Sequence, residues 1–399
     1  MKLSGIKVLD LSQFLPGPHL TLMMSDHGAD VIRIESPAGE PTRGIGLTRD
    51  GESVWFTNTH RGKRSVVLNL KQPGAVHAFL RLAEAADVIV EAFRPGVVDR
   101  LGIGFEAVRA LNPGIVYCSI AAFGQTGPYA AKPAHDISIQ AETGLLSLNL
   151  GQDGQPAMPG LPAADMAGSL MAMNGILMAL LRRTQTGRGD YIDISMQDSL
   201  ASWLVNVVGP VFAEDRAAIA KDERSFGGNA MYNLYRCADG AWLTIGGSEI
   251  KFAANLFTAL GRAELVELCR LPPGEAQKPA RDFLRDTFAS ESLAHWQSVL
   301  QGIDVCWAPV IDLHAALASE QLDERGMRLE FDPAHGGGRS STQLGIPIKF
   351  RDEPGQVVPK TPDMGEHTRD VLLEAGLSAN AVDALFADGA AIGPTDTRA

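Results

Sequence analysis

The sequence predicts an α/β protein whose large domain is a Rossmann-like, doubly wound parallel sheet, accompanied by a smaller α+β domain. Two observations predict this class. Short apolar runs alternate with helical patterns between residues 7 and 120, which is typical of repeated βαβ units. A charged segment at 214–225 is then followed by the hairpin signal Ala238-Asp239-Gly240 between two apolar runs.

The first βαβ unit consists of a strand at Lys7–Leu11, a helix at His19–His27 that stops at Gly28, and a strand at Asp30–Glu35. Crossovers between parallel strands are right-handed, so the repeats build one open sheet with ligands expected outside the carboxyl ends of its strands. The repeats that follow are a strand at Ser65–Leu70, a helix at Pro73–Ala86, a strand at Asp87–Phe93, a helix at Phe105–Leu111 and a strand at Ile115–Ile120.

The next segment contains the candidate catalytic residues. A Gly/Pro/Ala-rich loop delivers His135-Asp136 to the start of a helix that runs to about Leu148, and a long helix begins at Asp165, which we expect at or near its N-cap. Further elements are a strand at Tyr191–Ser195, a hairpin of Tyr232–Tyr235 with Trp242–Ile245, a helix at Glu249–Leu260 and a strand at Gln343–Phe350. We expect a large domain at 1–213, a linker at 214–225, a small domain at 226–330, and a return segment at 331–399 that completes the large domain.

Charge, cysteine spacing and helix length argue against several classes of protein. The net charge of −12 argues against general nucleic-acid binding. The four cysteines form no CxxC pair or His/Cys cluster, so we expect no metal and a reduced, cytoplasmic protein. The most apolar helical run, Met166–Leu181, falls short of the roughly 20 residues that a bilayer needs, so we expect a buried helix and no membrane partner.

Familiar nucleotide and hydrolase motifs are missing. The first turn is Phe14-Leu15-Pro16-Gly17-Pro18 rather than GxGxxG, and the chain has no GxxxxGK[ST], HExxH or GxSxG. The expected fold resembles a dinucleotide-binding fold because of its βαβ repeats. Since the dinucleotide motif is missing, its ligand must be held in another way.

Five cations lie in loops at the ends of strands of the predicted sheet. Arginine presents a fork of donors suited to phosphate oxygens, and lysine adds a point charge. In an acidic protein such a group can serve a phosphorylated ligand, although a solvated charged face is the alternative. These cations are Arg43, Arg61, Lys63, Arg64 and Arg94.

His135, Asp136 and Asp165 each have a structural alternative. A single histidine is more often structural than catalytic, and an Asp at a helix start is often a plain cap. Glu249 can likewise cap its own helix or pair on it. The catalytic interpretation gains support because these groups occupy separate loops on the ligand side of one sheet, near the predicted anion-binding edge.

The chain resembles the family III CoA-transferase (CaiB/BaiF) superfamily, which includes the α-methylacyl-CoA racemases, over nearly its whole length. The motifs that carry the resemblance are Gly17-Pro18, Gly28-Ala29-Asp30-Val31-Ile32-Arg33-Ile34-Glu35, Arg61-Gly62-Lys63-Arg64-Ser65, Arg94-Pro95-Gly96-Val97, Gly124-Gln125-Thr126-Gly127-Pro128-Tyr129, and Gly187-Arg188-Gly189 before Ile192-Asp193-Ile194-Ser195. The resemblance implies an interlocked homodimer, coenzyme A bound only as part of an acyl-CoA substrate, and the five cations at or near its phosphates.

Within this superfamily the residue before Asp136 separates two reactions. Racemases carry His-Asp there, as this chain does, and Asp165 and Glu249 match the second base and the acid near the histidine. The resemblance therefore implies a 2-methylacyl-CoA racemase in which His135 and Asp165 exchange the α-proton through an enolate, Glu249 orients His135, and Asp136 supports the site. Asp165 must then hold a proton at neutral pH, which requires apolar burial.

A CoA-transferase is the alternative, in which Asp136 is the nucleophile that passes CoA from an acyl-CoA to a free carboxylic acid. Gln140-Ala141-Glu142-Thr143-Gly144 is closer to transferase usage, whereas Glu91-Ala92 departs from the transferase pattern Glu-Asn. A third interpretation is a catalytically silent CoA-binding subunit.

Overall fold

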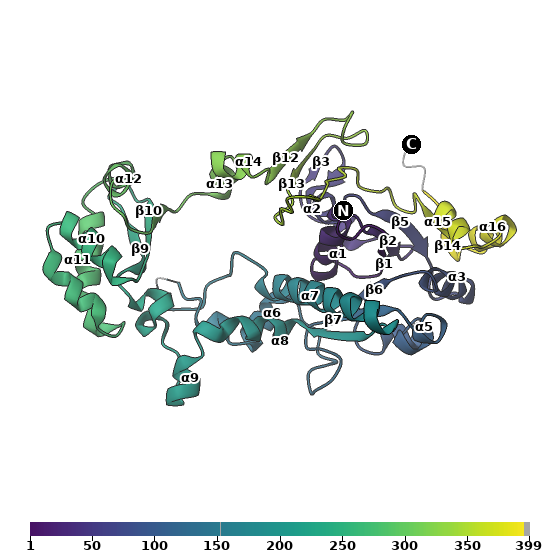
Figure 1. Ribbon diagram of the computed structural model, residues 1–399, viewed down its shortest axis with the longest axis horizontal. Helices are drawn as coiled ribbons and strands as arrows, with labels where there is room; N and C mark the ends of the chain where they lie inside the picture. The colour runs from purple at the N-terminus through teal and green to yellow at the C-terminus, as the bar shows by residue number, and fades with distance from the viewer. Residues whose placement is uncertain (152, 395–399) are drawn as a thin grey trace. The chain divides into compact units, whose positions relative to one another are not determined.

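The computed structural model describes residues 1–151 and 153–394. Its contacts divide the chain into two compact units, which Figure 1 follows by label and colour. The first unit contains residues 1–140, 161–200 and 317 onward, and the second contains Ala141–Gly160 and Ala201–Ala316. These bounds differ from the expected ones because residues 141–160 and 201–213 contact the second unit, whereas 317–330 contact the first.

A seven-stranded sheet, in the order β14-β5-β2-β1-β6-β7-β8, forms the centre of the first unit. Every neighbouring pair is parallel except β14 with β5, as the repeated βαβ pattern predicted. The strands are β1 (Lys7–Asp10), β2 (Asp30–Glu35), β5 (Arg64–Leu68), β6 (Val88–Glu91), β7 (Val116–Ala121), β8 (Tyr191–Ser195) and β14 (Ala391–Ile392).

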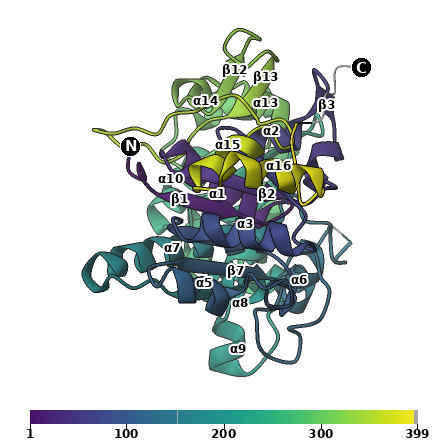
Figure 2. The same cartoon turned by 90° about the vertical axis from the view of Figure 1, so that its right-hand side faces the viewer.

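Helices cover both faces of this sheet, so it is doubly wound. One face packs on α3 (Pro73–Ala83), α5 (Phe105–Leu111), α15 (Thr368–Glu374) and α16 (Ala379–Ala387), and Figure 2 views the unit from the side of α3, α5 and α16. The other face packs on α1 (Pro16–Asp26) and α7 (Ala163–Thr186). Alternate residues of β1, β2, β6 and β7 divide between the two cores, as Val8 and Leu9 do.

Shorter elements complete the first unit. They are β3 (Thr48–Arg49), β4 (Glu52–Ser53), α2 (Val54–His60), α4 (Val97–Arg100), α6 (Asp136–Glu142), α8 (Met196–Ala201), α14 (Glu320–Glu324), β12 (Arg328–Phe331) and β13 (Ser341–Leu344). The strand predicted at Gln343–Phe350 is wrong beyond Leu344, because Gly345 and Pro347 follow it. The helix predicted from His135 to Leu148 is also too long: α6 ends at Glu142, and Gly144, at φ +85°, leads into a short 3-10 turn at Leu145–Ser147.

Helix α7 is longer than the apolar run that predicted it, at 24 residues, and ends at Gly187 with φ +68°. Within the described part of the chain, α7 is the one helix that is long and apolar enough to cross a membrane. In its most apolar 18-residue stretch, 44% is buried. Ala172, Ile176 and Leu180 belong to the core that covers one face of the sheet. One face of α7 is therefore buried as expected, but the expected short, buried helix is wrong in its length and in its other face, because α7 has 24 residues and exposes Leu177, Met178 and Leu181.

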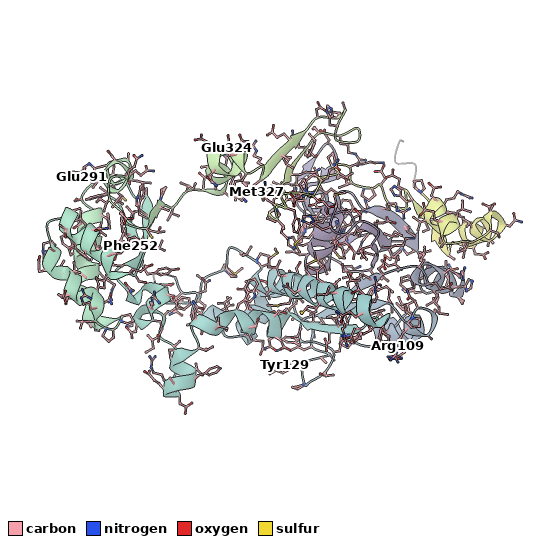
Figure 3. All side chains as sticks on the ribbon, in the orientation of Figure 1. Arg109, Tyr129, Phe252, Glu291, Glu324 and Met327 are labelled. Carbon is pink, nitrogen blue, oxygen red and sulfur yellow. The ribbon has the colours of Figure 1, made fainter. Side chains whose placement is uncertain are left out.

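The second unit has its own three-stranded antiparallel sheet, ordered β11-β10-β9, and its own apolar core. Phe252, Phe257 and Phe288 are buried in that core, and Figure 3 labels Phe252. The predicted hairpin is present as β9 (Tyr232–Arg236) and β10 (Trp242–Gly246). Two short helical turns, at Ala220–Asp222 and Arg224–Gly228, begin inside the linker expected at 214–225, and the second extends beyond it. The remaining elements are α9 (Gly209–Glu214), α10 (Ile250–Ala259), α11 (Lys278–Phe288), α12 (Leu293–Leu300), β11 (Trp307–Pro309) and α13 (Leu313–Leu317).

Candidate active site

His135 and Asp165 line one pocket of about 290 Å³ at the carboxyl ends of β1, β6 and β7. The sheet places the pocket where an open α/β fold binds its ligands. We call it the His135 pocket. It is lined by Gln13, Phe14, Pro16, Ala92, Phe93, Arg94, Pro95, Ile120, Ala121, Ala122, Ala130, Lys132, Pro133, Ala134, His135, Asp165 and Met196.

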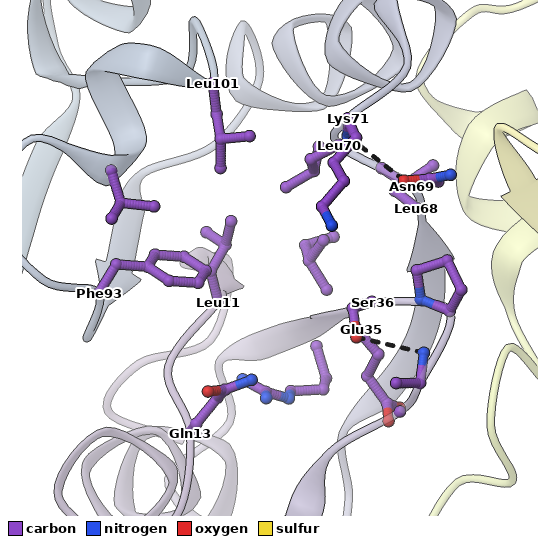
Figure 4. A pocket seen from close by; sticks show the side chains of 16 residues that line it. Leu11, Gln13, Glu35, Ser36, Leu68, Asn69, Leu70, Lys71, Phe93 and Leu101 are labelled. Atoms are coloured by element: carbon purple, nitrogen blue, oxygen red, sulfur yellow. Dashed lines mark hydrogen bonds between the residues drawn. The ribbon is translucent and has the colours of Figure 1, made fainter.

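A larger cavity of about 550 Å³ adjoins the His135 pocket, since Gln13 and Phe93 line both. We call it the strand-edge cavity because residues after β1, β2, β5 and β6 enclose it. Figure 4 shows Leu11, Leu101 and Phe93 in its apolar wall, with Lys71 reaching toward its interior. The side chains of Gln13 and Phe93 thus lie between the two spaces.

The Asp136 side chain links the start of α6, next to His135, to the start of α7, which carries Asp165. Its Oδ1 atom accepts hydrogen bonds from the backbone N–H groups of Ala164 at 2.7 Å and Asp165 at 3.2 Å. Its Oδ2 atom accepts one from Gln140 Nε2 at 2.6 Å, and the same Nε2 donates to Leu161 O at 3.1 Å. The first residue of α6 thus provides the side-chain cap for α7.

The expected N-cap position of Asp165 needs correction. Helix α7 begins at Ala163, with Pro162 at the N-cap, so Asp165 lies in the first helical turn. Proline offers no side-chain oxygen to the first N–H groups of the helix, and the Asp136 carboxylate provides it instead. The Asp165 side chain contributes to the wall of the His135 pocket rather than capping its own helix.

The Asp165 carboxyl group holds its proton unusually tightly. Burial raises its pKa from 3.8 to about 7, and the nearby negative charge of Asp136 adds to the effect. Around neutral pH the protonated and ionised forms of Asp165 are therefore both populated. A group in this state can either donate or accept a proton.

His135 has an exposed side chain whose ring lies edge-on to that of Phe14, with centroids 5.9 Å apart and planes at 86°. The loop that brings it there follows β7 and includes Tyr129, which Figure 3 labels. Glu249 belongs to the second unit, where its backbone C=O accepts hydrogen bonds from the N–H groups of Phe252 and Ala253 at the start of α10. Its proximity to His135 stays a prediction.

Four of the five predicted cations are engaged with protein carboxylates. Arg43 binds Glu35 at 2.7 Å, Arg61 binds Asp26 at 2.6 Å, Lys63 binds Asp10 at 3.2 Å, and Arg64 binds Asp30 at 2.6 Å. Arg61 and Lys63 are only 2% and 4% exposed, so their charged groups do not face solvent in this conformation. Arg94 is the predicted cation that lines the His135 pocket.

Sequence reasoning missed Lys71 and Lys132. Lys71 lines the strand-edge cavity, and Lys132 lines the His135 pocket with its Nζ 4.6 Å from the centre of the Tyr129 ring. Both had a signal in the sequence, because Lys71 follows an apolar strand closely and Lys132 lies three residues before His135.

Glu91 is a further titratable group behind the His135 pocket, at the end of β6. Burial raises its pKa from 4.5 to about 7, although hydrogen bonds from Ser119 Oγ and from the Phe93 N–H at 2.8 Å oppose the shift. Through Phe93 it is tied to the loop that carries Arg94.

Comparisons with known proteins identify the family to which the chain belongs. Residues 3–368 match the model of CoA-transferase family III. Human alpha-methylacyl-CoA racemase is 32% identical over 97% of this chain and 97% of its own, and mouse succinyl-CoA:glutarate CoA-transferase is 30% identical over 93% of this chain and 86% of its own. A crystal structure of a CAIB/BAIF family protein from Brucella suis superposes with a TM-score of 0.80 at 29% identity, covering 94% of this chain and 99% of that one.

Proposed function

The chain belongs to CoA-transferase family III, and we propose that within this family it acts as a 2-methylacyl-CoA racemase that moves the α-proton between two bases. The observation that carries the proposal is the pairing of His135 with Asp165 in one pocket. One is an imidazole, and the other is a carboxyl group whose pKa is about 7. A base and a protonated acid that line the same pocket are what a reversible 1,1-proton transfer requires.

In the proposed reaction, His135 removes the α-proton of one enantiomer and the electron pair moves into the thioester carbonyl, giving an enolate. Protonated Asp165 then delivers its proton to the opposite face of the α-carbon, which leaves Asp165 ionised and His135 protonated. The roles reverse for the other enantiomer. Glu249 is proposed to orient His135, and Asp136 holds the start of α7 and therefore Asp165.

The acyl-CoA is proposed to occupy both adjoining spaces. Its nucleotide end fits the strand-edge cavity of about 550 Å³ beside Lys71, and its thioester reaches the His135 pocket past Gln13 and Phe93. Contact of the five predicted cations with CoA phosphates stays a proposal. Arg94 is the one of the five that lines the His135 pocket, beside the proposed position of the thioester. The other four cations are bound to protein carboxylates, and of those carboxylates Glu35, the partner of Arg43, lines the strand-edge cavity.

The similarity to succinyl-CoA:glutarate CoA-transferase supports a CoA-transferase as the second candidate. The sequence suggested Asp136 as its nucleophile, but both Asp136 oxygens accept hydrogen bonds and Asp136 is not among the residues that line the His135 pocket. Asp165 lines that pocket. In this second candidate, the geometry therefore favours Asp165 as the nucleophile that would attack the thioester carbonyl and release CoA.

An interlocked homodimer in the cytoplasm is part of the proposal. Apolar side chains exposed on α7 support it, because Leu177, Met178 and Leu181 are 38%, 66% and 68% exposed in the single chain. Light scattering during gel filtration tests the dimer, which predicts twice the chain mass of 42.5 kDa.

The reaction is tested by incubating the protein with a single enantiomer of a 2-methylacyl-CoA in deuterated water, with and without a carboxylic acid acceptor. The racemase predicts α-deuteration and loss of optical purity that need no acceptor. CoA transfer to the acceptor without α-deuteration would favour the transferase, and binding without either reaction would favour the silent subunit.

A further inference from the structure

Phe14 has an unusual backbone conformation at the edge of the His135 pocket. Its φ is +63°, and the other non-glycine residues with positive φ in the described chain are Asp50 and Asp215. Asp tolerates this region because its short side chain can bond locally, whereas a bulky side chain there is a genuine outlier. Such strain persists only where the surrounding structure enforces it.

A buried carboxylate holds this conformation. The Phe14 N–H donates to Glu40 Oε1 at 2.9 Å, and Glu40 is 2% exposed. The other oxygen of Glu40 accepts a hydrogen bond from Arg33, which also pairs with Asp10 at 3.1 Å. The turn after β1 is thus fixed to a buried network of charges, and its strained residue cannot relax without breaking a charged hydrogen bond.

The enforced conformation places an aromatic ring against the imidazole. Phe14 and His135 both line the His135 pocket, and their rings meet edge to face at 5.9 Å. The His135 side chain is exposed, so a neighbouring ring limits the rotations open to it. Glycine or asparagine would adopt the backbone conformation of Phe14 with less strain, which indicates that the ring itself is needed.

We propose that Phe14 is a positioning residue that holds the His135 imidazole in the orientation needed for α-proton transfer. The inference rests on the proposed function, because it requires His135 to act on the substrate. A proton-transferring group must be held within hydrogen-bond reach of the reacting atom. Loss of the ring therefore reduces the chemical step while leaving the binding of acyl-CoA intact.

The kinetic test compares Phe14→Leu, which loses the ring, with Phe14→Tyr, which keeps it. Phe105→Leu is the matched control, because Phe105 is also half-buried and meets Tyr117 edge to face at 6.0 Å, but lines neither space. We expect Phe14→Leu to lower kcat for α-deuteration about tenfold with KM within about twofold, and Phe14→Tyr and Phe105→Leu to keep most of the rate. An unchanged kcat in Phe14→Leu, or a loss confined to KM, overturns the proposal.

A second readout separates this inference from the proposed function. With selectively labelled histidine, the ring protons of His135 are identified in NMR spectra as the signals lost in His135→Gln. Phe14→Leu should move these signals by removing a ring current, and Phe105→Leu should leave them in place. Unmoved signals overturn the positioning role. Moved signals in an enzyme whose α-deuteration survives His135→Gln overturn the proposed function, while the aromatic contact stands.

Discussion

The backbone N–H of Asp165 donates a hydrogen bond of 3.2 Å to the carboxylate of Asp136, so one acid caps the helix that carries the other. This arrangement brings a negative charge close to the Asp165 carboxyl group, which adds to the effect of burial in raising its pKa to about 7. The His-Asp pair and the distant Asp165 are thereby one structural unit. The capping acid supports the second candidate base both mechanically and electrostatically.

Asp136→Asn should shift the pH dependence of the reaction. The amide oxygen still caps α7, but the negative charge is gone, so the pKa of Asp165 falls part of the way toward its usual 3.8. In the direction that uses protonated Asp165 as the acid, the decline of kcat with rising pH then begins at lower pH. The pH profile of α-deuteration from each enantiomer measures this. Asp370→Asn, an exposed acid in the first turn of α15, is the control. Identical profiles for Asp136→Asn and the parent protein would contradict the coupling.

Glu91→Gln should remove part of the pH dependence of stability. A carboxyl group whose folded pKa of about 7 exceeds its usual 4.5 contributes stability that is full below pH 4.5 and is lost as the pH rises through 7. A glutamine oxygen can still accept from the Phe93 N–H, and its Nε2 can donate to Ser119 Oγ once that hydroxyl, which donates to Glu91 in the parent protein, has turned. Between pH 5 and pH 8 the free energy of unfolding should therefore fall less in the variant, by an amount on the order of 2–3 kcal/mol. Urea titrations across this range measure the difference, and parallel curves would show that Glu91 is not buried as described.

Lys63→Met should destabilise the first unit far more than Arg64→Met. The Lys63 ammonium is buried beside Asp10, whose pKa is lowered to about 2, whereas the Arg64 pairs are partly exposed. Removing one partner of a buried pair costs roughly 3–5 kcal/mol, but an exposed pair contributes about 0–1 kcal/mol. Urea unfolding of both variants tests this. Equal losses would favour a direct ligand role for Lys63 over a structural one.

Arg94→Ala should weaken the binding of acyl-CoA. Arg94 lines the His135 pocket, beside the proposed thioester end of the ligand, and loss of a charge-assisted hydrogen bond to the acyl-CoA should raise KM about tenfold while kcat changes little. Arg109→Ala is the control, since Arg109 pairs with Glu106 on the exposed surface of α5. A change in kcat with constant KM would place Arg94 at the reacting atoms instead.

The sequence predicted most of the first unit because its strands are continuous apolar runs separated by strong helix starts and stops. The motif resemblance is likewise confirmed, since the family model covers residues 3–368. The sequence could not predict which charged side chains pair across the fold. The sequence predicted that Arg61 and Lys63 bind an anionic ligand. The structure instead pairs Arg61 with Asp26 and Lys63 with Asp10. The positive φ of the turn after β1 falls on Phe14, where no glycine or asparagine predicts it.

The same limit applies to the capping of α7. The sequence Ala163-Ala164-Asp165 at a helix start favours Asp165 as the cap of that helix. A nearby side-chain oxygen usually accepts the hydrogen bonds of the first backbone N–H groups. The cap comes instead from Asp136, which is distant in sequence. Nothing in the local pattern distinguishes the two arrangements, yet the difference determines which acid lines the pocket.

The two-base account is tested most directly by following α-deuteration from each separate enantiomer of a 2-methylacyl-CoA with the parent protein, His135→Ala and Asp165→Asn. Each variant should lose racemisation by at least a factor of about 100. Each should also retain exchange from only one enantiomer, and the two variants should retain opposite ones. Equal loss from both enantiomers in both variants, or full exchange in His135→Ala, would contradict the assignment of His135 and Asp165 as opposing bases.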